Sequence, residues 1–425
     1  MALTVFLLLG ILLAAGIPIA ISLGLATTIG LFVFTDIPMM TVSQKLFTSL
    51  ESFPLMAVPF FVLAGNIFNT GGVAQRLINL TNVWVRHIHG GLAIAGVLGC
   101  AIFAAISGSS PATVIAIGGI LIPAMVKAGY DREYAVGIMA NAGTLGILIP
   151  PSIPMIVYGF VTNQSVGQLF IAGIVPGLML TAMLVVTSYI IARRRGYERQ
   201  APATCGERAK ATLEALPSLT LPIIIIGGIY GGIFTPTEAA VVACVAGLVI
   251  GLFVHHEMTW RDLPKILADS AKSTSMLMLI ISMAMLFGYI LTTEMIPQRL
   301  SQAVLSTIDA PWMVLVVINI ILLIAGCFLE PTSIILILGP LFYAVTAPLG
   351  INPIHLGIII TMNMEVGMIT PPVGLNLYVA SGISGMKLGQ VARASLPWSL
   401  VLLLALLIVT YVPQIALWLP NMIWH

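Results

Sequence analysis

Charge is scarce in this chain. Of 425 residues, 17 are Lys or Arg and 15 are Asp or Glu, which is 8% of the chain, against ~25% in soluble proteins. Hydrophobic residues make up 59%, and the mean hydropathy is +1.10. A soluble monomer would have too little polar surface to cover that much apolar material. Soluble enzymes, disordered proteins and disulfide-rich secreted domains are therefore excluded, and a polytopic membrane protein remains.

Cysteine is also scarce, and its four copies are scattered. They form no CxxC pair and have no histidine at a metal-binding spacing, so we expect neither a disulfide scaffold nor a zinc site. The net charge of +2 is too small to indicate nucleic-acid binding. No P-loop, HExxH or TVGYG motif occurs. No basic residue precedes the first apolar run, which predicts a retained span rather than a cleaved signal peptide.

Apolar segments predict a chain that crosses the bilayer many times, since a spanning helix needs ~20 mostly apolar residues. Two of the segments, 3–15 and 219–231, are too short to cross alone and can merge with their successors. Amphipathic stretches at 40–53 and 258–273 predict interfacial arm helices. The ten predicted spans are 3–15, 17–35, 54–86, 133–162, 167–192, 219–231, 235–254, 274–308, 353–383 and 396–420.

Two further apolar stretches, 90–128 and 310–349, are interrupted in the middle. SGSSP interrupts the first at 107–111, and EPTS interrupts the second at 330–333. Such turns cannot face lipid, because their backbone groups would lack hydrogen-bond partners. We therefore predict two re-entrant hairpins, each entering and leaving on one side of the membrane.

Basic residues are distributed unevenly over this topology. With the N-terminus outside, 14 of the 17 Lys and Arg residues fall inside, Arg76 lies within a long helix, and only Lys45 and Arg299 fall outside. This distribution follows the positive-inside rule. It supports ten spans and two hairpins, with both termini outside. The hydrophilic stretch 193–216 is then a cytoplasmic linker.

The two sides of this linker resemble each other weakly. Gly146-x-x-x-Pro150-Pro151 recurs as Gly367-x-x-x-Pro371-Pro372, 221 residues later. Five crossings in each half, an odd number, would invert the second half relative to the first, and inverted repeats with broken helices are typical of secondary transporters. We predict the repeats at 1–216 and 217–425. Their parts are outer and arm helices at 1–89 and 217–309, and a hairpin with a broken helix at 90–163 and 310–384. A helix with the cytoplasmic linker at 164–216 and a final helix at 385–425 complete the two repeats.

Polar groups concentrate at the predicted hairpin tips. Ser107, Ser109, Ser110 and Thr113 place four hydroxyls within seven residues of apolar surroundings. Helix-end amides and carbonyls at a hairpin tip can bind anions and cations. N-capping explains one or two of these hydroxyls rather than all four, so we favour a ligand-binding role. Cys327–Ser333 forms the corresponding tip in the second half.

The Gly-Pro-Pro segments predict helices that unwind inside the membrane. Pro removes a backbone donor and disfavours helical angles in the residue before it. Free carbonyls follow, in Asn141–Ser152 and again in Asn363–Asn376, and a hard cation such as Na⁺ binds neutral oxygens of this kind. A kinked helix packed by its neighbours is the alternative. Glu330 and Glu365 are acids in apolar surroundings; they either bind protons or cations or accept backbone amides at a helix start.

Long motifs in these segments resemble one known family. SGSSPATVIAIG, NAGTLGILIPPSIPMIVYG, GIFTPTEAA and NMEVGMITPPVGLNLYV are similar to the large membrane subunit of tripartite ATP-independent periplasmic (TRAP) transporters, most of all the C4-dicarboxylate type. The GIFTPTEAA segment itself fits a capping box at Thr235–Glu238, for which we prefer a structural role. The resemblance covers nearly the whole chain.

The resemblance implies a multi-pass protein of the bacterial inner membrane and an elevator fold of the ion-transporter superfamily type. The hairpins and broken helices would form a moving transport domain, and the arms and outer helices a scaffold. It implies Na⁺-driven uptake, substrate delivery by a periplasmic binding protein, and a small four-helix membrane subunit as partner. The family pattern puts one Na⁺ among Ser107, Ser110, Gly146, Ile149 and Pro150, and a second among Gly326, Gly367, Thr370 and Val373.

Our hypothesis is a symporter, not an enzyme, that imports a small carboxylate. No Lys or Arg falls in the predicted pocket, so hydroxyls, amides, helix ends and Na⁺ must meet the anion. The candidate substrate-binding residues are Ser109, Thr113, Asn141, Thr144, Ser333 and Asn376. The alternatives are a permease for sialic acid or another carboxylate, and an ion-coupled carboxylate symporter that works alone. A channel and a membrane-embedded enzyme are the remaining classes.

Overall fold

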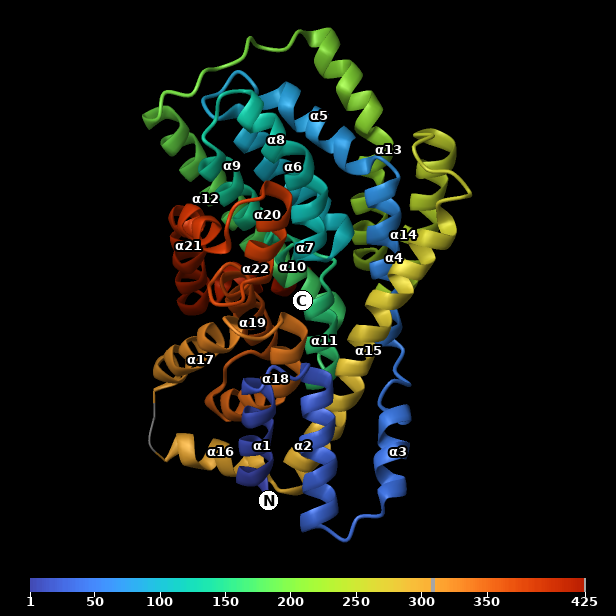
Figure 1. The fold of residues 1–425 in the computed structure, drawn as a ribbon, viewed down its shortest axis with the longest axis vertical. Coiled ribbons are helices and arrows are strands. Elements are labelled where there is room, and N and C mark those ends of the chain that lie inside the picture. The colour runs from blue at the N-terminus through green and yellow to red at the C-terminus, as the bar shows by residue number, and fades with distance from the viewer. Residues whose placement is uncertain (307–309, 424–425) are drawn as a thin grey trace.

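The computed structural model describes residues 1–306 and 310–423, and every regular element in these ranges is a helix (Figure 1). The first half contains α1 (Ala2–Ala14), α2 (Ile19–Phe34), α3 (Met39–Thr48), α4 (Ala57–Thr70), α5 (Val73–Val85), α6 (Gly91–Ser107), α7 (Ser110–Thr113), α8 (Gly119–Lys127), α9 (Arg132–Ala142), α10 (Leu145–Leu148), α11 (Ile153–Thr162) and α12 (Val166–Arg194). The second contains α13 (Cys205–Tyr230), α14 (Pro236–Val249), α15 (Leu263–Thr293), α16 (Ile296–Leu305), α17 (Pro311–Gly326), α18 (Pro331–Thr346), α19 (Pro353–Gly367), α20 (Leu375–Ser384), α21 (Leu388–Tyr411) and α22 (Gln414–Ile423).

The prediction of an all-α polytopic membrane protein is confirmed. Within the described ranges, eight helices are long and apolar enough to cross a membrane, or nine if α4 and α5, bent by 65° at their junction, count as one span. The bend falls at Gly71 and Gly72, and Gly72 has φ +72°, a left-handed angle that glycine adopts without a steric cost. The predicted single span 54–86 is therefore two helices.

Several predicted boundaries are wrong. The segment 219–231 merges with its predecessor rather than its successor, because α13 begins at Cys205, where Thr204 and Glu207 form a capping box. The linker thus shrinks from 193–216 to the ten residues 195–204. The arm at 258–273 is not a separate helix, since α15 runs without a break from Leu263 to Thr293. The predicted span 274–308 breaks after Thr293, and its last two residues lie outside the described ranges.

The end segments also differ from the predicted spans. Segments 3–15 and 17–35 do not merge: α1 and α2 are separate helices that pack against each other, divided by Gly16 at φ +78° and Pro18. The span predicted at 396–420 is α21, which begins earlier at Leu388, followed by the separate helix α22. Pro413 stands just before α22, and a proline cannot continue the backbone hydrogen bonding of α21. The capping box at Thr235–Glu238 is confirmed, with both of its hydrogen bonds present.

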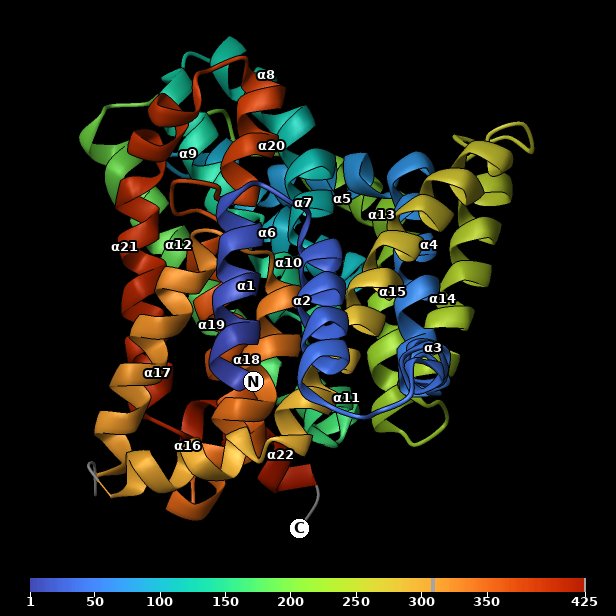
Figure 2. The same cartoon turned by 60° about the horizontal axis from the view of Figure 1, so that its bottom comes forward.

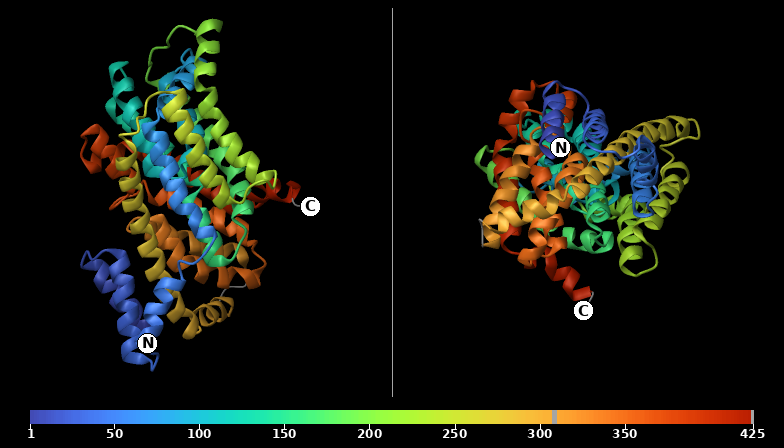
Figure 3. Two further views of the ribbon diagram at one scale, coloured as in Figure 1. Left: turned by 90° about the vertical axis from the view of Figure 1, so that its right-hand side faces the viewer. Right: turned by 90° about the horizontal axis from the view of Figure 1, so that it is seen from below.

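Helices of two kinds occupy different sides of the molecule. Helices α4, α13, α14 and α15 lie side by side along one edge (Figures 1 and 2). The broken and hairpin helices α6–α11 and α17–α20 pack with α12 and α21 on the other side, as the right panel of Figure 3 shows. Contacts between the two sides run mainly through α5 with α6, α15 with α18 and α16 with α18.

The ten-residue linker is tied to the first half at both of its ends. The Tyr197 hydroxyl donates to Asp131 Oδ2 at 2.7 Å, and Arg195 Nη1 lies 2.7 Å from the same oxygen. The Tyr197 hydroxyl, helped by Arg195, holds the pKa of the Asp131 carboxyl below its usual value. Farther along, Arg86 pairs with Glu207 at 2.9 Å. These ties fix the path of the linker from α12 to α13.

The order of helices in the first half recurs in the second. Helix α9 begins at Arg132 and α19 at Pro353, 221 residues later; α11 begins at Ile153 and α20 at Leu375, 222 residues later. A hairpin precedes each pair, and a long helix follows it. Both predicted interruptions are present, at Gly108–Ser109 and at Cys327–Glu330. This order is the one that a repeat predicts.

Close packing of α9 against α21 gives a first prediction. A β-carbon on Gly137 would overlap the carbonyl oxygen of Ala394 in α21, whereas one on Gly227 of α13 would meet nothing within 4 Å. We expect Gly137→Ala to lower the free energy of unfolding by about 1–3 kcal/mol and Gly227→Ala to leave it unchanged or raise it slightly. Thermal unfolding of the purified protein in detergent measures both; equal midpoints for the two variants would contradict this packing.

Candidate functional site

The two hairpin tips and the two helix breaks meet in the middle of the molecule. Helix α7 packs against α10 and α20, and α18 packs against α11 and α19 (Figures 1 and 2). The predicted cation-binding residues of each half are brought together here, each set from a hairpin tip and a break that are far apart in sequence.

In the first half, the hairpin tip and the break touch through their backbones. Helix α6 ends at Ser107, Gly108 has φ +63°, and the Gly108 carbonyl accepts a hydrogen bond from the Ile153 amide at 3.3 Å. A β-carbon on Gly146 would lie 2.6 Å from the Ser109 carbonyl oxygen, so only glycine permits this approach. The break and the tip therefore form one structural unit.

Hydroxyls of the first tip bond mainly to one another and to the tip backbone. The Ser107 and Thr113 hydroxyls lie 3.0 Å apart, and Thr113 donates to the Ser109 carbonyl at 2.8 Å. Ser107, Ser110 and Thr113 are buried. Each hydroxyl oxygen keeps a lone pair after it donates, so this cluster presents acceptors to a cation.

Proline determines which carbonyls are left without a helical partner. In a helix, the carbonyl of residue i accepts from the amide of residue i+4. Pro150 and Pro151 have no amide hydrogen, so the carbonyls of Gly146 and Ile147 lose this donor. The Ser152 hydroxyl donates to Ile147 at 2.5 Å. No i+4 amide exists for Gly146, whose carbonyl is one of the predicted cation ligands.

The second half has the same construction. A β-carbon on Gly326 would lie 2.9 Å from Gly367 Cα, so α17 and α19 touch backbone to backbone at the tip. The Val373 amide donates to the Cys327 carbonyl at 3.0 Å, which ties the break to the tip. The Thr370 hydroxyl donates to the Val366 carbonyl at 2.6 Å. Pro371 removes the i+4 donor of Gly367, as Pro150 does for Gly146.

Asn376 joins the two units. It lies in the first turn of α20, and its side chain reaches the tip of the first hairpin. The Asn376 Nδ2 donates to Ser110 Oγ at 2.7 Å and to the Ala140 carbonyl at 3.1 Å. All of these groups are buried. A change at the second break can therefore reach the first tip through one side chain.

A small cavity of about 110 Å³ lies between the two tips. Ser109 and Ser110 line it from the first tip, and Glu330 and Thr332 line it from the second. Glu330 is the one charged residue of this lining, and no Lys or Arg contributes to it. An anion in this cavity would therefore have to be held by hydroxyls, backbone amides and bound cations.

Most of the predicted substrate-binding side chains do not line this cavity, although Ser109 does. The Asn141 Nδ2 donates to the Gly137 carbonyl at 2.8 Å, and its Oδ1 accepts from Ser399 of α21 at 3.3 Å. Thr144 donates to the Asn141 carbonyl at 2.8 Å. Ser333 donates to Glu330 Oε1 at 3.2 Å, so it contacts a residue of the lining but does not line the cavity itself. Thr113 and Asn376 lie behind the first tip, as described above.

Some residues of this region were not identified from the sequence. Thr332, Leu277 and Met368 line the cavity. Thr332 follows Glu330 at the tip and could have been included from its position; nothing in the sequence points to Leu277 or Met368. Glu365, by contrast, does not line the cavity; it is buried in α19, and neither of its carboxyl oxygens has a hydrogen-bond partner.

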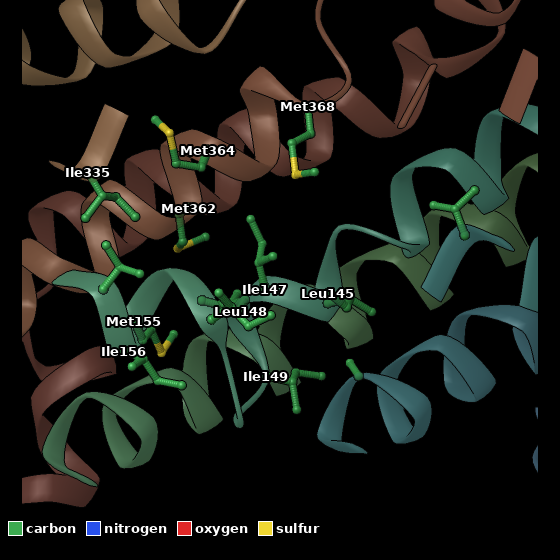
Figure 4. Packing of buried hydrophobic residues seen from close by; sticks show 14 of the residues in the cluster. Leu145, Ile147, Leu148, Ile149, Met155, Ile156, Ile335, Met362, Met364 and Met368 are labelled. Atoms are coloured by element: carbon green, nitrogen blue, oxygen red, sulfur yellow. The ribbon is translucent and has the colours of Figure 1, made fainter. Parts of the chain in front are cut away.

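An apolar cluster joins the two breaks. Figure 4 shows Ile147, Leu148 and Ile149 of the first break in one cluster with Met362, Met364 and Met368 of the α19 segment. All six are buried. Methionine adapts its shape to irregular gaps, which suits a contact between two interrupted helices.

Comparison with known proteins identifies a family and a fold. Residues 6–415 match the family described as "Tripartite ATP-independent periplasmic transporter, DctM component". The chain is 53% identical to a C4-dicarboxylate TRAP transporter large permease protein of Pseudomonas aeruginosa, over 92% of each chain. It is 49% identical to the protein of that name from Rhodobacter capsulatus, again over 92% of each. Among solved structures it resembles the Neisseria gonorrhoeae protein MtrF, with a TM-score of 0.61 at 12% identity over 94% of this chain and 93% of that one.

The bridge at Asn376 gives a second prediction. Because Ser110 and Asn376 bond to each other, we expect Ser110→Ala and Asn376→Ala to be non-additive in thermal unfolding, with a coupling energy of about 0.5–3 kcal/mol. Asn319→Ala is the matched control, since this buried amide bonds to Thr410 and Asn363 and shares no partner with Ser110. Additive effects for the Ser110 and Asn376 pair would mean that the bridge does not form.

Proposed function

This chain belongs to the DctM family of tripartite ATP-independent periplasmic transporters, and we propose that it is the large permease subunit through which a C4-dicarboxylate is imported by symport with Na⁺. It is a multi-pass protein of the inner membrane and a transport protein, not an enzyme. Relatives named as C4-dicarboxylate permeases, matched along 92% of the chain, support the substrate class.

The observation that carries Na⁺ coupling is the doubled contact between a hairpin tip and a Gly-Pro-Pro break. Na⁺ prefers neutral oxygens, and in each half proline leaves a glycine carbonyl, Gly146 or Gly367, without its helical donor. The first ion is held by Ser107, Ser110, Gly146, Ile149 and Pro150, and the second by Gly326, Gly367, Thr370 and Val373. Each set brings a tip and a break within contact distance.

The anion occupies the cavity between the tips. Ser109, Ser110 and Thr332 offer hydroxyls there, and α18 begins at this point, so its free amides face the cavity region. Glu330 is the one acidic residue of the lining, and no Lys or Arg lies there to attract an anion. Anion binding therefore depends on the two Na⁺ ions, which is the differential affinity that coupled transport requires.

In the proposed transport cycle, one set of helices moves relative to the other. The hairpin and broken helices carry both ion sites and the cavity, and they form the transport domain of an elevator. Helices α4, α13, α14 and α15 form part of the scaffold. A periplasmic binding protein delivers the substrate, and a small four-helix membrane subunit docks on the scaffold. The likeness in fold to the efflux-pump protein MtrF is compatible with this arrangement.

Two other readings of the same site differ in what they require. A permease for sialic acid needs room for a larger substrate than a cavity of about 110 Å³ provides in this conformation. A symporter that works alone would transport without a binding protein. Omitting the binding protein from reconstituted vesicles distinguishes a symporter that works alone from a permease that needs the binding protein. Competition by larger carboxylates tests the size of the substrate.

Na⁺ dependence is the direct test of this function. We expect vesicles that contain this chain, the small subunit and the binding protein to accumulate a labelled C4-dicarboxylate only when Na⁺ is higher outside. A K⁺ gradient of equal size is the control, because it supplies the same charge and ionic strength without Na⁺. Accumulation at the full rate with no Na⁺ gradient would rule out symport.

Thr370 tests the second ion site. We expect Thr370→Ala to raise the Na⁺ concentration for half-maximal uptake by roughly tenfold, which corresponds to the loss of about 1.4 kcal/mol of ion binding. Thr361→Ala is the matched control, since both threonines lie in the α19 segment and donate to the carbonyl four residues earlier, at 2.6 Å for Thr370 and 2.8 Å for Thr361. The same Na⁺ dependence in both variants would remove Thr370 from the site.

A further inference from the structure

A second cavity, of about 400 Å³, lies away from the candidate transport site. Helices α3 and α15 form one wall, with Lys45, Gly288 and Tyr289 among its residues. Helices α11 and α18 form the other wall, which includes Leu336 and Leu341. The volume falls within the range of ~300–1,000 Å³ that is common for ligand pockets. The cavity therefore lies between α3 and α15 on one side and the hairpin and broken helices α18 and α11 on the other.

One wall of this cavity is apolar and the other carries a single cation. Val161, Pro340 and Leu341 line the apolar wall. Lys45 is exposed, its Nζ lies 5.1 Å from the centre of the Tyr289 ring, and it takes part in none of the ion pairs of the described residues. Two acids, Glu51 and Glu294, each lie two residues after a residue of the lining, and neither lines the cavity. A ligand with an anionic head and an apolar tail fits both walls.

Three of the four hydroxyl groups that line the cavity already donate hydrogen bonds elsewhere. The Thr48 hydroxyl donates to the Gln44 carbonyl at 3.0 Å, Ser49 to Leu46 at 3.2 Å, and Thr292 to Gly288 at 2.9 Å. These three hydroxyl hydrogens are thus committed to nearby backbone carbonyls, whereas the Tyr289 phenol keeps its donor beside Lys45. An anion in this cavity would be met by the Lys45 ammonium group, with its three donors.

The charge distribution along the sequence singles out the same place. Lys45 and Arg299 are the two basic residues that the predicted topology leaves on the outside. Arg299 lies two residues after Pro297, which lines the cavity. Phe47 and Met40, on the same helix as Lys45, are 78% and 77% exposed, as suits a helix that lies in the apolar edge of a bilayer. Of the two exceptions to the positive-inside rule, Lys45 therefore lines the cavity, and Arg299 lies two residues from a lining residue.

We propose that this cavity binds the headgroup of an acidic phospholipid, with the phosphate on Lys45 and the start of an acyl chain along Leu336 and Leu341. Charge complementarity selects an anionic head, and the apolar wall selects a lipid rather than a free phosphate ion. The bound lipid bridges α3 and α15 to α11 and α18. This site depends on the chain being embedded in a membrane and not on the identity of its substrate.

The lipid is tested on the full chain, stripped of lipid in a neutral detergent. Phosphatidylglycerol, phosphatidylcholine and inorganic phosphate are titrated separately, with retained lipid measured by native mass spectrometry and stability by thermal midpoint. We expect phosphatidylglycerol to be retained roughly fivefold more tightly than phosphatidylcholine and to raise the midpoint. Equal retention of the two lipids, or an equal rise with inorganic phosphate alone, would overturn the proposal.

Two variants separate the head from the tail. Lys45→Gln should remove the preference for phosphatidylglycerol, whereas Lys272→Gln, an exposed lysine elsewhere on α15, should keep it. Gly288→Phe fills the cavity, because a β-carbon at Gly288 meets nothing within 4 Å, and it should abolish retention. Gly227→Phe is the matched control, equally open but on α13. Retention that is unchanged in both Lys45→Gln and Gly288→Phe would overturn the site.

Discussion

The whole arrangement depends on one constraint, that a backbone carbonyl inside a membrane must have a partner. Pro-Pro pairs break two helices at membrane depth and remove the donors that Gly146 and Gly367 would otherwise use. The structure meets this demand by bringing a hairpin tip against each break. Glycine at both contacts permits backbone to approach backbone. The ion sites that we propose follow from this packing and need no charged side chain.

The absence of Lys and Arg from the cavity lining bears on how anion transport would be coupled to Na⁺. A fixed Lys or Arg in the cavity would hold an anion whether or not Na⁺ were present. Here no Lys or Arg lines the cavity, and its one ionisable side chain is the acid Glu330, so the protein offers an anion no fixed positive charge. The link from one break to the other tip is a neutral amide, Asn376, bonded to Ser110. Ion binding at one unit can thus bias the geometry of the other without a change of charge along the connection.

Local signals in the sequence located the breaks, and tertiary packing decided the rest. Gly and Pro impose their backbone angles wherever they stand, so both hairpin tips and both Gly-Pro-Pro breaks were predictable. The start of α13 at Cys205 was missed, because hydropathy reports where a helix leaves the membrane and not where it ends. The Thr204 and Glu207 capping box was the available signal. Asn141 shows the limit for side chains: its polarity suggested a ligand, yet its amide serves α9 and α21.

The few charged residues outside the cavity between the hairpin tips face a similar constraint. In a chain with 8% charged residues, each charge near the bilayer needs a partner, water or an anionic lipid. Arg195 finds Asp131 and Arg86 finds Glu207, both along the linker. Lys45 has only the face of Tyr289 and a cavity beside it. Since that cavity lies between helices that an elevator would move apart, its occupant would favour the conformation in which both walls are in contact.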